Sequence, residues 1–143
     1  MQIKITTDYG IRSVLYLASH SGVVTAQEIS EGMCIPMGYT AKVLRTLRKA
    51  GLIHSQNGSS GGHQLTKDPS EITMLDIVDP LEGTIRINRC LEDDGYCSRN
   101  GVGTCPVHVY YEQLQQVMLD YLSGTTVADI LNGTQAKTST RDK

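Results

Sequence analysis

The stretch that decides the fold is TAQEISEGMCIPMGYTAKVLRTLRKAGLIHSQNGSSGGHQLT, residues 25–66. It opens with a capping box, in which the Thr25 hydroxyl and the Glu28 carboxylate each satisfy a backbone N–H of the first helical turn. This box predicts a short helix, and Pro36 predicts the start of a second one because its fixed φ suits the first helical position. Two short extended runs then flank a glycine-rich tip at Asn57, which predicts a β-hairpin.

The second of these helices has two chemically different faces. Val43, Leu44 and Leu47 form an apolar side, and the opposite side is basic. Residues 37–67 contain five Lys or Arg and no Asp or Glu, although the whole chain has a net charge of -2. Such a basic patch in an acidic protein marks a docking site for a polyanion, whereas the alternative is a solvated helix face. Helix, short helix, turn, basic helix and hairpin together give the order of a winged helix-turn-helix.

A helix of this kind fits the major groove of DNA, where its N-terminal residues reach base edges and flanking cations hold phosphates. A hairpin tip beside it would lie along the minor groove. The residues expected to contact DNA are Thr25 and Gln27 for the backbone, Gly38, Tyr39, Thr40 and Lys42 for bases, Arg45 and Lys49 for phosphates, and Asn57 and Gly58 for the minor groove. The alternative from a different class is a winged helix that binds protein.

The rest of the chain predicts an appendage to this head. Thr73 begins a short helix that we expect to stop near Pro80, and residues 84–88 alternate as a strand would. A long helix from Pro106 carries an apolar stripe, which is either core against the head or a two-fold dimer seam, and we favour the seam. The expected fold class is mainly α (α+β). The predicted organisation is a winged helix-turn-helix domain at 1–83, a strand and cysteine-rich loop at 84–105, a dimerisation helix and packing helix at 106–132, and a disordered tail at 133–143.

Cys90, Cys97 and Cys105 lie within 16 residues and form the candidate metal site. The gaps between them are wide for structural zinc, whereas iron–sulfur clusters tolerate longer loops. Pro106 makes Cys105 the expected N-cap of the long helix, which puts His108 at the third helical position, facing Cys105 across the turn. Spacing alone leaves three interpretations open: an iron–sulfur cluster, a zinc ion, or metal-free redox thiols.

The other cysteine and histidines are expected to be structural. Cys34 is interpreted as a small buried hydrophobe, and His20, His54 and His63 as surface residues. Residues 1–8 hold no apolar run and no stretch approaches the length of a membrane span, so we expect a cytoplasmic protein with reduced thiols and no membrane partner. No nucleophile elbow or phosphate-binding loop is present, so we do not expect an enzyme.

The chain resembles the IscR/NsrR type of bacterial iron–sulfur transcriptional regulators. The motifs that carry the resemblance are TDYGIR at 7–12, LRKAGL at 47–52, the Gly-Gly wing that ends at Leu65, and the cysteine triad with Cys105-x-x-His108. The resemblance covers about residues 1 to 131. It implies a homodimer crossed at the long helix, a near-palindromic operator in double-stranded DNA, no small-molecule substrate, and a cluster whose state sets DNA affinity.

The resemblance also bears on the cluster ligands. His108 matches the imidazole of one relative, whereas Asp8 matches a carboxylate that another contributes from the partner subunit; the Cys105–His108 geometry favours His108. A [2Fe–2S] cluster is favoured over [4Fe–4S], although the cysteine gaps are longer than usual. Asn57 and Ala41 stand where relatives often carry Arg and Glu. We therefore predict a homodimeric regulator, with a repressor favoured, that senses iron, redox state or nitric oxide; the alternative is a zinc-stapled or metal-free thiol-based regulator.

Overall fold

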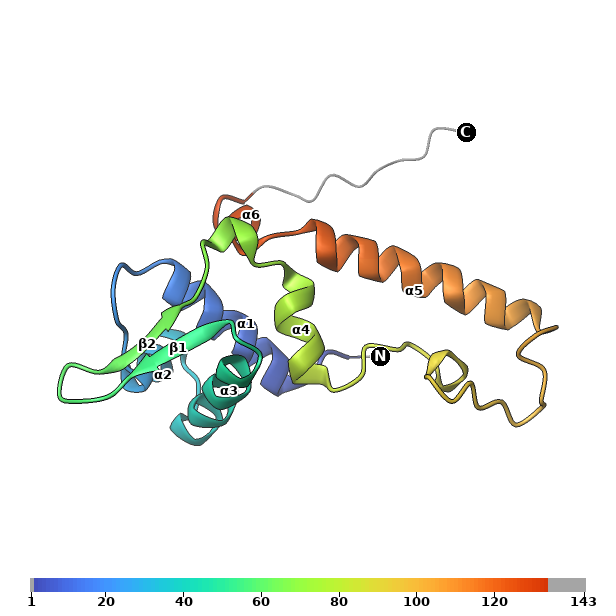
Figure 1. The fold of residues 1–143 in the computed structure, drawn as a ribbon, viewed down its shortest axis with the longest axis horizontal. Helices are drawn as coiled ribbons and strands as arrows, with labels where there is room; N and C mark the ends of the chain where they lie inside the picture. Colours follow the sequence, from blue (N-terminus) through green and yellow to red (C-terminus); the bar gives the residue numbers. More distant parts are fainter. Residues whose placement is uncertain (1, 134–143) are drawn as a thin grey trace.

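A helical head with a small sheet occupies one end of the molecule, and a long helix extends away from it (Figure 1). The computed structural model describes residues 2–133. Its elements are α1 (Ile5–Ala18), α2 (Ala26–Met33), α3 (Met37–Lys49), β1 (Ile53–Gln56), β2 (Gly62–Leu65), η1 (Pro69–Glu71), α4 (Met74–Glu82), η2 (Arg89–Leu91), α5 (Pro106–Gly124) and α6 (Val127–Leu131). The predicted disordered tail falls outside the described residues except for Gly133.

Local sequence starts several of these elements in the same way. At α2 the Thr25 hydroxyl accepts a hydrogen bond from the Glu28 N–H at 3.2 Å, and the Glu28 carboxylate accepts one from the Thr25 N–H at 2.7 Å. The predicted helix start at Thr73 is also confirmed, by a capping box with Asp76, and further boxes begin η1 and α6. At α3 the structure shifts the predicted start by one residue, because Pro36 is the N-cap and Met37 the first helical residue.

The head is held together by apolar side chains from α1, α2, α3 and the segments that follow them. α3 packs against α1 and α2, and α1 also packs against α4. Burial of these side chains supplies the main driving force for folding of the head. The buried members of this core are Val14, Leu17, Val24, Ile29, Val43, Leu44, Leu47, Leu52, Ile53, Ile72, Ile77 and Val127.

The predicted hairpin is confirmed as an antiparallel pair, β1 with β2, in a register that pairs Ile53 with Leu65. Its base is tied to the segment before α2, because Val24 and His63 exchange two backbone hydrogen bonds of 2.9 and 2.7 Å. Gly62 allows this approach: a Cβ there would lie 2.5 Å from the carbonyl oxygen of Val24. The wing is therefore fixed to the helix-turn-helix rather than projecting freely.

Two short elements return the chain from the long helix to the head. The N–H of Met74 donates to the carbonyl of Thr125 at 2.8 Å, and the N–H of Val127 donates to that of Ile72 at 2.9 Å. Val127 is fully buried in the core of the head. α6 therefore belongs to the head in space, although it follows α5 in sequence (Figure 1).

The predicted helix stop at Pro80 is displaced to Gly83. α4 continues through Pro80 to Glu82, and Gly83 ends it with a φ of 79° and an N–H that donates to the carbonyl of Asp79. Proline removes one hydrogen bond from a helix, and here the loss falls in the last turns, where few further bonds depend on it. A positive φ favours glycine, so Gly83 marks the actual end.

The predicted strand at residues 84–88 is wrong. No strand lies beside this segment among the described residues, and its backbone pairs with a side chain instead. The N–H of Ile87 donates to Oε1 of Gln115 at 2.9 Å, and Nε2 of Gln115 donates to the carbonyl of Ile85 at 3.1 Å. The amide of Gln115 thus offers the donor and the acceptor that a neighbouring strand would supply.

α5 extends beyond the head and is the longest element (Figure 1). The segment between α4 and α5, which contains η2 and the cysteines, runs back along it to its first residue. Only Gln115 of α5 is buried. Across the described part of the chain, none of the helices combines the length and the apolar character needed to span a membrane.

Candidate DNA-binding surface and metal centre

The outer face of α3 presents most of the residues predicted to contact DNA. These exposed residues are Gly38, Tyr39, Lys42, Arg45 and Lys49. No carboxylate forms a salt bridge with Lys42, Arg45 or Lys49 within the described chain, so their charges remain available to an anion. Tyr39 is steadied by an edge-on contact with Tyr9, with ring centroids 5.5 Å apart. The face is therefore positively charged and fixed at its leading end.

Thr40 is the exception. It is predicted to contact bases, but in the structure it lies in the core. Its side chain is fully buried and its hydroxyl donates to the carbonyl of Pro36 at 3.4 Å. The sequence contains the signal for this position. Thr40 lies three and four residues before Val43 and Leu44, which places it on the apolar face of α3.

The predicted backbone contacts at the start of α2 are exposed but already hydrogen-bonded within that helix. The hydroxyl of Thr25 donates to the carboxylate of Glu28 at 2.7 Å, and Nε2 of Gln27 donates to Glu31 at 2.8 Å. The hydrogen bonds from Thr25 lower the pKa of the Glu28 carboxyl. DNA contact by either residue would require these side chains to share or exchange a hydrogen bond.

The wing brings Asn57 and Gly58 to its exposed tip, as the sequence predicts. Gly58 has a φ of 113°, a conformation that favours glycine. One histidine of the wing departs from expectation: His63 is half-buried against α3 rather than at the surface. Cys34 departs in the opposite direction. It is exposed, because it ends α2 in the left-handed conformation with a φ of 52°, outside the packed face of the helix.

The cysteine loop gathers the four predicted ligands around one pocket of about 240 Å³, whose lining includes Cys90, Cys97, Cys105 and His108. Nδ1 of His108 lies 3.3 Å from Sγ of Cys90. The sequence expected His108 to face Cys105, whereas the recorded contact is with Cys90. Imidazole and thiolate side chains are both common ligands of iron and zinc.

Each cysteine of this loop is held by local structure. Cys105 is the N-cap of α5, as predicted, so its sulfur lies at the positive end of that helix. Asn88 caps η2 and accepts a hydrogen bond from the N–H of Cys90 at 3.3 Å. Backbone N–H groups of Gly101 and Arg99 lower the pKa of the Cys97 thiol. The lowered pKa of Cys97 favours its thiolate, the form in which cysteine binds a metal.

The donors do not meet at a single point. Between residues 2 and 133, no three His, Cys, Asp or Glu side chains are close enough together to hold one metal ion. Asp8, the alternative fourth ligand, does not line the pocket of its own chain. It forms a salt bridge with Arg12 one helical turn away on α1.

Comparison with known proteins gives this arrangement a context. The family model Rrf2, described as an iron-dependent transcriptional regulator, matches residues 3–133. The chain belongs to the Rrf2 family. This membership confirms the predicted resemblance, and the protein is a DNA-binding transcriptional regulator of that family rather than an enzyme.

Individual relatives of this Rrf2 protein agree. An HTH-type transcriptional regulator of Aquifex aeolicus is 33% identical over 128 residues, 89% of each chain. The regulator IscR of Serratia proteamaculans is 31% identical, over 92% of this chain and 80% of its own. The structure of CymR, the global cysteine regulator of B. subtilis, matches with a TM-score of 0.73 and 27% identity, over 94% of this chain and 99% of its own. The predicted winged helix-turn-helix fold is thereby confirmed.

Proposed function

We propose that this Rrf2-family protein is a homodimeric repressor of a near-palindromic operator, and that an iron–sulfur cluster bound by Cys90, Cys97, Cys105 and His108 sets its operator affinity. The observation that carries the proposal is that these four side chains line one pocket at the start of α5. The iron-dependent description of the family and the similarity to an IscR regulator support it.

The donor chemistry of the pocket fits such a cluster. Three thiols and one imidazole are ligand types of iron–sulfur centres, and the N-terminus of α5 favours an anionic, thiolate-bound group. A cluster contains several irons, so its ligands need not meet at one ion, which agrees with the spread of the donors. When bound, the cluster, with [2Fe–2S] favoured, would supply a centre that responds to iron supply, redox state or nitric oxide.

We assign the fourth ligand to His108 rather than to Asp8 of the partner subunit. The 3.3 Å contact between the imidazole of His108 and the sulfur of Cys90 supports this assignment. Asp8 would first have to leave its salt bridge with Arg12. His108 needs a smaller rearrangement, since its only ionic neighbour within the described chain is Glu112, at 3.4 Å.

The apolar face of α5 supports the homodimer. The exposed apolar residues follow the alternating three- and four-residue spacing of a coiled-coil seam, and they are Val107, Tyr110, Leu114, Val117 and Tyr121. Together these side chains form one exposed apolar face, in which Val117 is 66% exposed, and a contiguous face of this kind marks an interaction surface. A second α5 in a two-fold arrangement would cover the whole face with an identical one.

The route from the cysteine loop to α3 runs through α4. Gln115 fixes residues 85 and 87 on α5, and α4 immediately precedes this segment. α4 packs against α1, α3 and α5. Its Leu81 leaves no free space against α1, because a Cβ on Gly10 would lie 2.2 Å from the Leu81 side chain. A displacement of the loop would therefore shift α4, and through it the helices that present the DNA-binding surface.

Anaerobic purification tests the cluster directly. We expect a coloured protein with matching iron and sulfide contents, and loss of the colour in Cys97→Ala. Cys34→Ser is the matched control, since it removes a thiol outside the pocket. Zinc in place of iron would support the zinc-stapled alternative. A colourless, metal-free protein whose DNA binding responds to peroxide would support the thiol-based one.

The regulatory part needs a DNA-binding measurement. Duplexes selected from a random pool by the anaerobic wild-type protein provide an operator-like target. We expect Cys97→Ala to bind this target with altered affinity, and Lys42→Ala to reduce the slope of log affinity against log salt by about one. Unchanged binding by Cys97→Ala, despite loss of the colour, would separate the cluster from regulation.

A further inference from the structure

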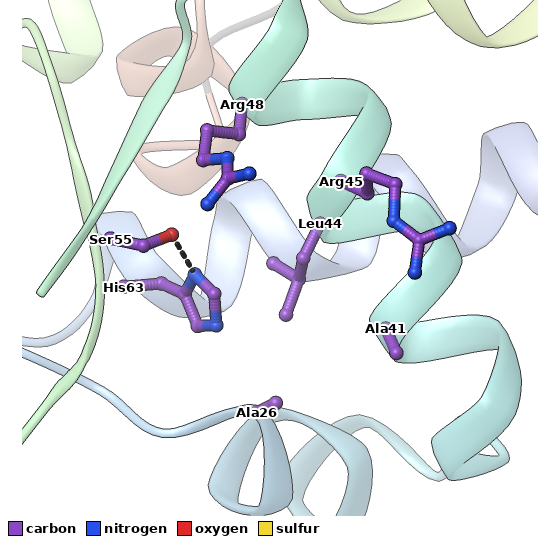
Figure 2. A pocket seen from close by; sticks show the side chains of 7 residues that line it. All are labelled: Ala26, Ala41, Leu44, Arg45, Arg48, Ser55 and His63. Carbon is purple, nitrogen blue, oxygen red and sulfur yellow. Dashed lines mark hydrogen bonds between the residues drawn. The ribbon is translucent and has the colours of Figure 1, made fainter. Parts of the chain in front are cut away.

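A pocket of about 210 Å³ lies between α3, the start of α2 and the two strands of the wing (Figure 2). Its walls are formed by Ala26, Ala41, Leu44, Arg45, Arg48, Ser55 and His63. The two alanines leave room at its base, and no Asp or Glu lines it. We call it the α3–wing pocket. Its lining is basic on one side and carries a hydrogen-bonded imidazole on the other.

The two arginines of the pocket have no acidic partner. No salt bridge within residues 2–133 involves Arg45 or Arg48. In Figure 2 the guanidinium of Arg48 extends toward Ser55 and His63, while that of Arg45 lies on the other side of Leu44. A guanidinium presents several donors in a planar fork that matches the oxygens of a phosphate. The pair therefore suits an oxyanion seated above Leu44.

His63 adds a directed donor to this site. Its Nδ1 lies 2.9 Å from the hydroxyl oxygen of Ser55, its partner across the hairpin. Burial, together with the charge of Arg48, lowers the pKa of His63, which favours the neutral ring. In the tautomer in which Ser55 donates to Nδ1, the proton is on Nε2, which faces the pocket (Figure 2). A neutral ring in that state donates one hydrogen bond to an anion.

The position of the pocket indicates which anion reaches it. A protein that sets a helix in the major groove and a hairpin along the neighbouring minor groove must let one sugar–phosphate strand pass between the two. The α3–wing pocket lies in this interval, between the outer face of α3 and the base of the wing. The N-terminus of α2 forms another part of its wall and adds a positive partial charge.

We propose that the α3–wing pocket binds one phosphate of the DNA backbone, with Arg45 and Arg48 facing its charge and His63 donating a hydrogen bond to it. The proposal rests on the proposed DNA binding and adds Arg48, Ser55 and His63 to the contact surface. Ser55 acts as a positioning residue, since it orients the ring of His63. The site would fix the spacing between helix and wing on the duplex without reading sequence.

The first experiment measures how duplex affinity depends on salt, with the full-length anaerobic protein. Arg48→Gln should lower the slope of log affinity against log salt by about one, because one phosphate contact fewer releases fewer counterions. The control Arg86→Gln removes an exposed arginine outside the head and should leave the slope unchanged. If wild type binds no duplex, the proposed function fails. If wild type binds and Arg48→Gln keeps its slope, the pocket assignment alone fails.

The second experiment locates the phosphate. Single linkages of the selected duplex are replaced, one at a time, by uncharged methylphosphonates. At one linkage we expect the replacement to weaken DNA binding by the wild type but to have little further effect on binding by Arg48→Gln or His63→Gln. Such non-additivity would mark direct contact between that phosphate and the pocket. His54→Gln, an exposed histidine on β1, should respond like wild type. Additive losses at every linkage would overturn the assignment, and circular dichroism excludes misfolding of each variant.

A free anion is the competing occupant, and inorganic phosphate is the probe for it. The ring signals of His63 are followed by NMR as phosphate is added without DNA. Binding to a duplex phosphate predicts no saturable shift at submillimolar phosphate, because a single small anion lacks the surrounding duplex contacts. Saturation in that range, with an unchanged salt slope for Arg48→Gln, would identify a small-anion site instead and overturn the proposal.

Discussion

The helices α3 and α5 both carry an apolar face, but only α3 buries that face within its own chain. α3 has 13 residues and buries Thr40, Val43, Leu44 and Leu47 inside its own chain. α5 has 19 residues and buries only Gln115, while a full seam of apolar side chains stays exposed. The head can therefore fold on contacts within one chain. In the proposed homodimer a second copy of α5 would cover this seam, which would make the geometry of the α5 arm open to regulation.

The largest effect is expected when a charge is placed in the apolar seam of α5. Val117→Glu should convert the dimer to monomers, because two unpaired carboxylates would be buried at the two-fold axis, a cost of about 3–5 kcal/mol for each uncompensated charge. Sedimentation equilibrium measures the change. Gln116→Glu adds the same charge on an exposed position of α5 outside the seam and should leave the dimer intact. A dimer that survives Val117→Glu would remove α5 from the interface.

Truncation of a core residue tests how far the stability of the head depends on its own buried contacts. Leu47→Ala should lower the free energy of unfolding of the head by about 2–5 kcal/mol, since Leu47 is fully buried and a cavity remains. Leu114→Ala removes the same atoms from α5, where the side chain is 40% exposed within one chain. At protein concentrations low enough to keep the chain monomeric, urea titration should show a much smaller loss of unfolding free energy for Leu114→Ala. Equal losses would mean that the arm is as self-sufficient as the head.

The junction between the two regions depends on Gln115. Gln115→Leu removes both hydrogen bonds to the segment before the cysteines and leaves the N–H of Ile87 without a partner, at a cost of about 1–3 kcal/mol. Hydrogen exchange at the amide of Ile87 should become faster. Gln116→Leu, on the exposed side of the helix, is the control. Protection of Ile87 that persists in Gln115→Leu would show that other contacts hold this segment.

The smallest expected effect concerns the return of the chain to the head. Thr126→Ala removes the cap of α6 and should cost about 0.5–2 kcal/mol. Ser123→Ala, which alters a neighbouring exposed hydroxyl, should cost less.

The effect of Thr126→Ala should also depend on pH. Hydrogen bonds from the N–H and hydroxyl of Thr126 lower the pKa of Asp129 in the folded state. Their contribution is therefore complete above the pKa of an unfolded aspartate and is lost as pH falls through the lower folded value. The difference between the melting temperatures of wild type and Thr126→Ala should narrow in acid, leaving the loss of the hydrogen bond from the Asp129 N–H to the Thr126 hydroxyl. A constant difference between them would show that the carboxylate is not involved.

Short-range chemistry explains which parts of the fold could be predicted. The capping boxes at Thr25 and Thr73 and the glycine-rich hairpin each depend on residues only a few positions apart, so the sequence contains all of their partners. Polarity alone predicts Thr40 at the DNA, whereas its position along the helix places it on the buried apolar face. Cys34 and His63 were misassigned because burial depends on which element packs over them.

The strand wrongly predicted at residues 84–88 shows what a local sequence pattern cannot predict. Alternation predicts a strand, but the backbone at 84–88 has no regular secondary structure, and the N–H of Ile87 donates to a side chain 28 positions further along in α5. Nothing local to Ile87 indicates Gln115. The candidate ligands show the same limit. The spacing of the cysteines predicts a metal site, but the contact of His108 with Cys90 arises only because the loop folds back on α5.

The sequence by itself determined the order of elements, their starts, the charge of α3 and the kind of donor in the cysteine loop, because these follow from side-chain chemistry and spacing along one segment. Only the tertiary structure decided that α6 returns to the head, that Gln115 holds the segment before the cysteines, and that Arg48 and His63 share a pocket. Those features join residues far apart in the chain, and only the packing and hydrogen bonds of the folded chain bring such residues together.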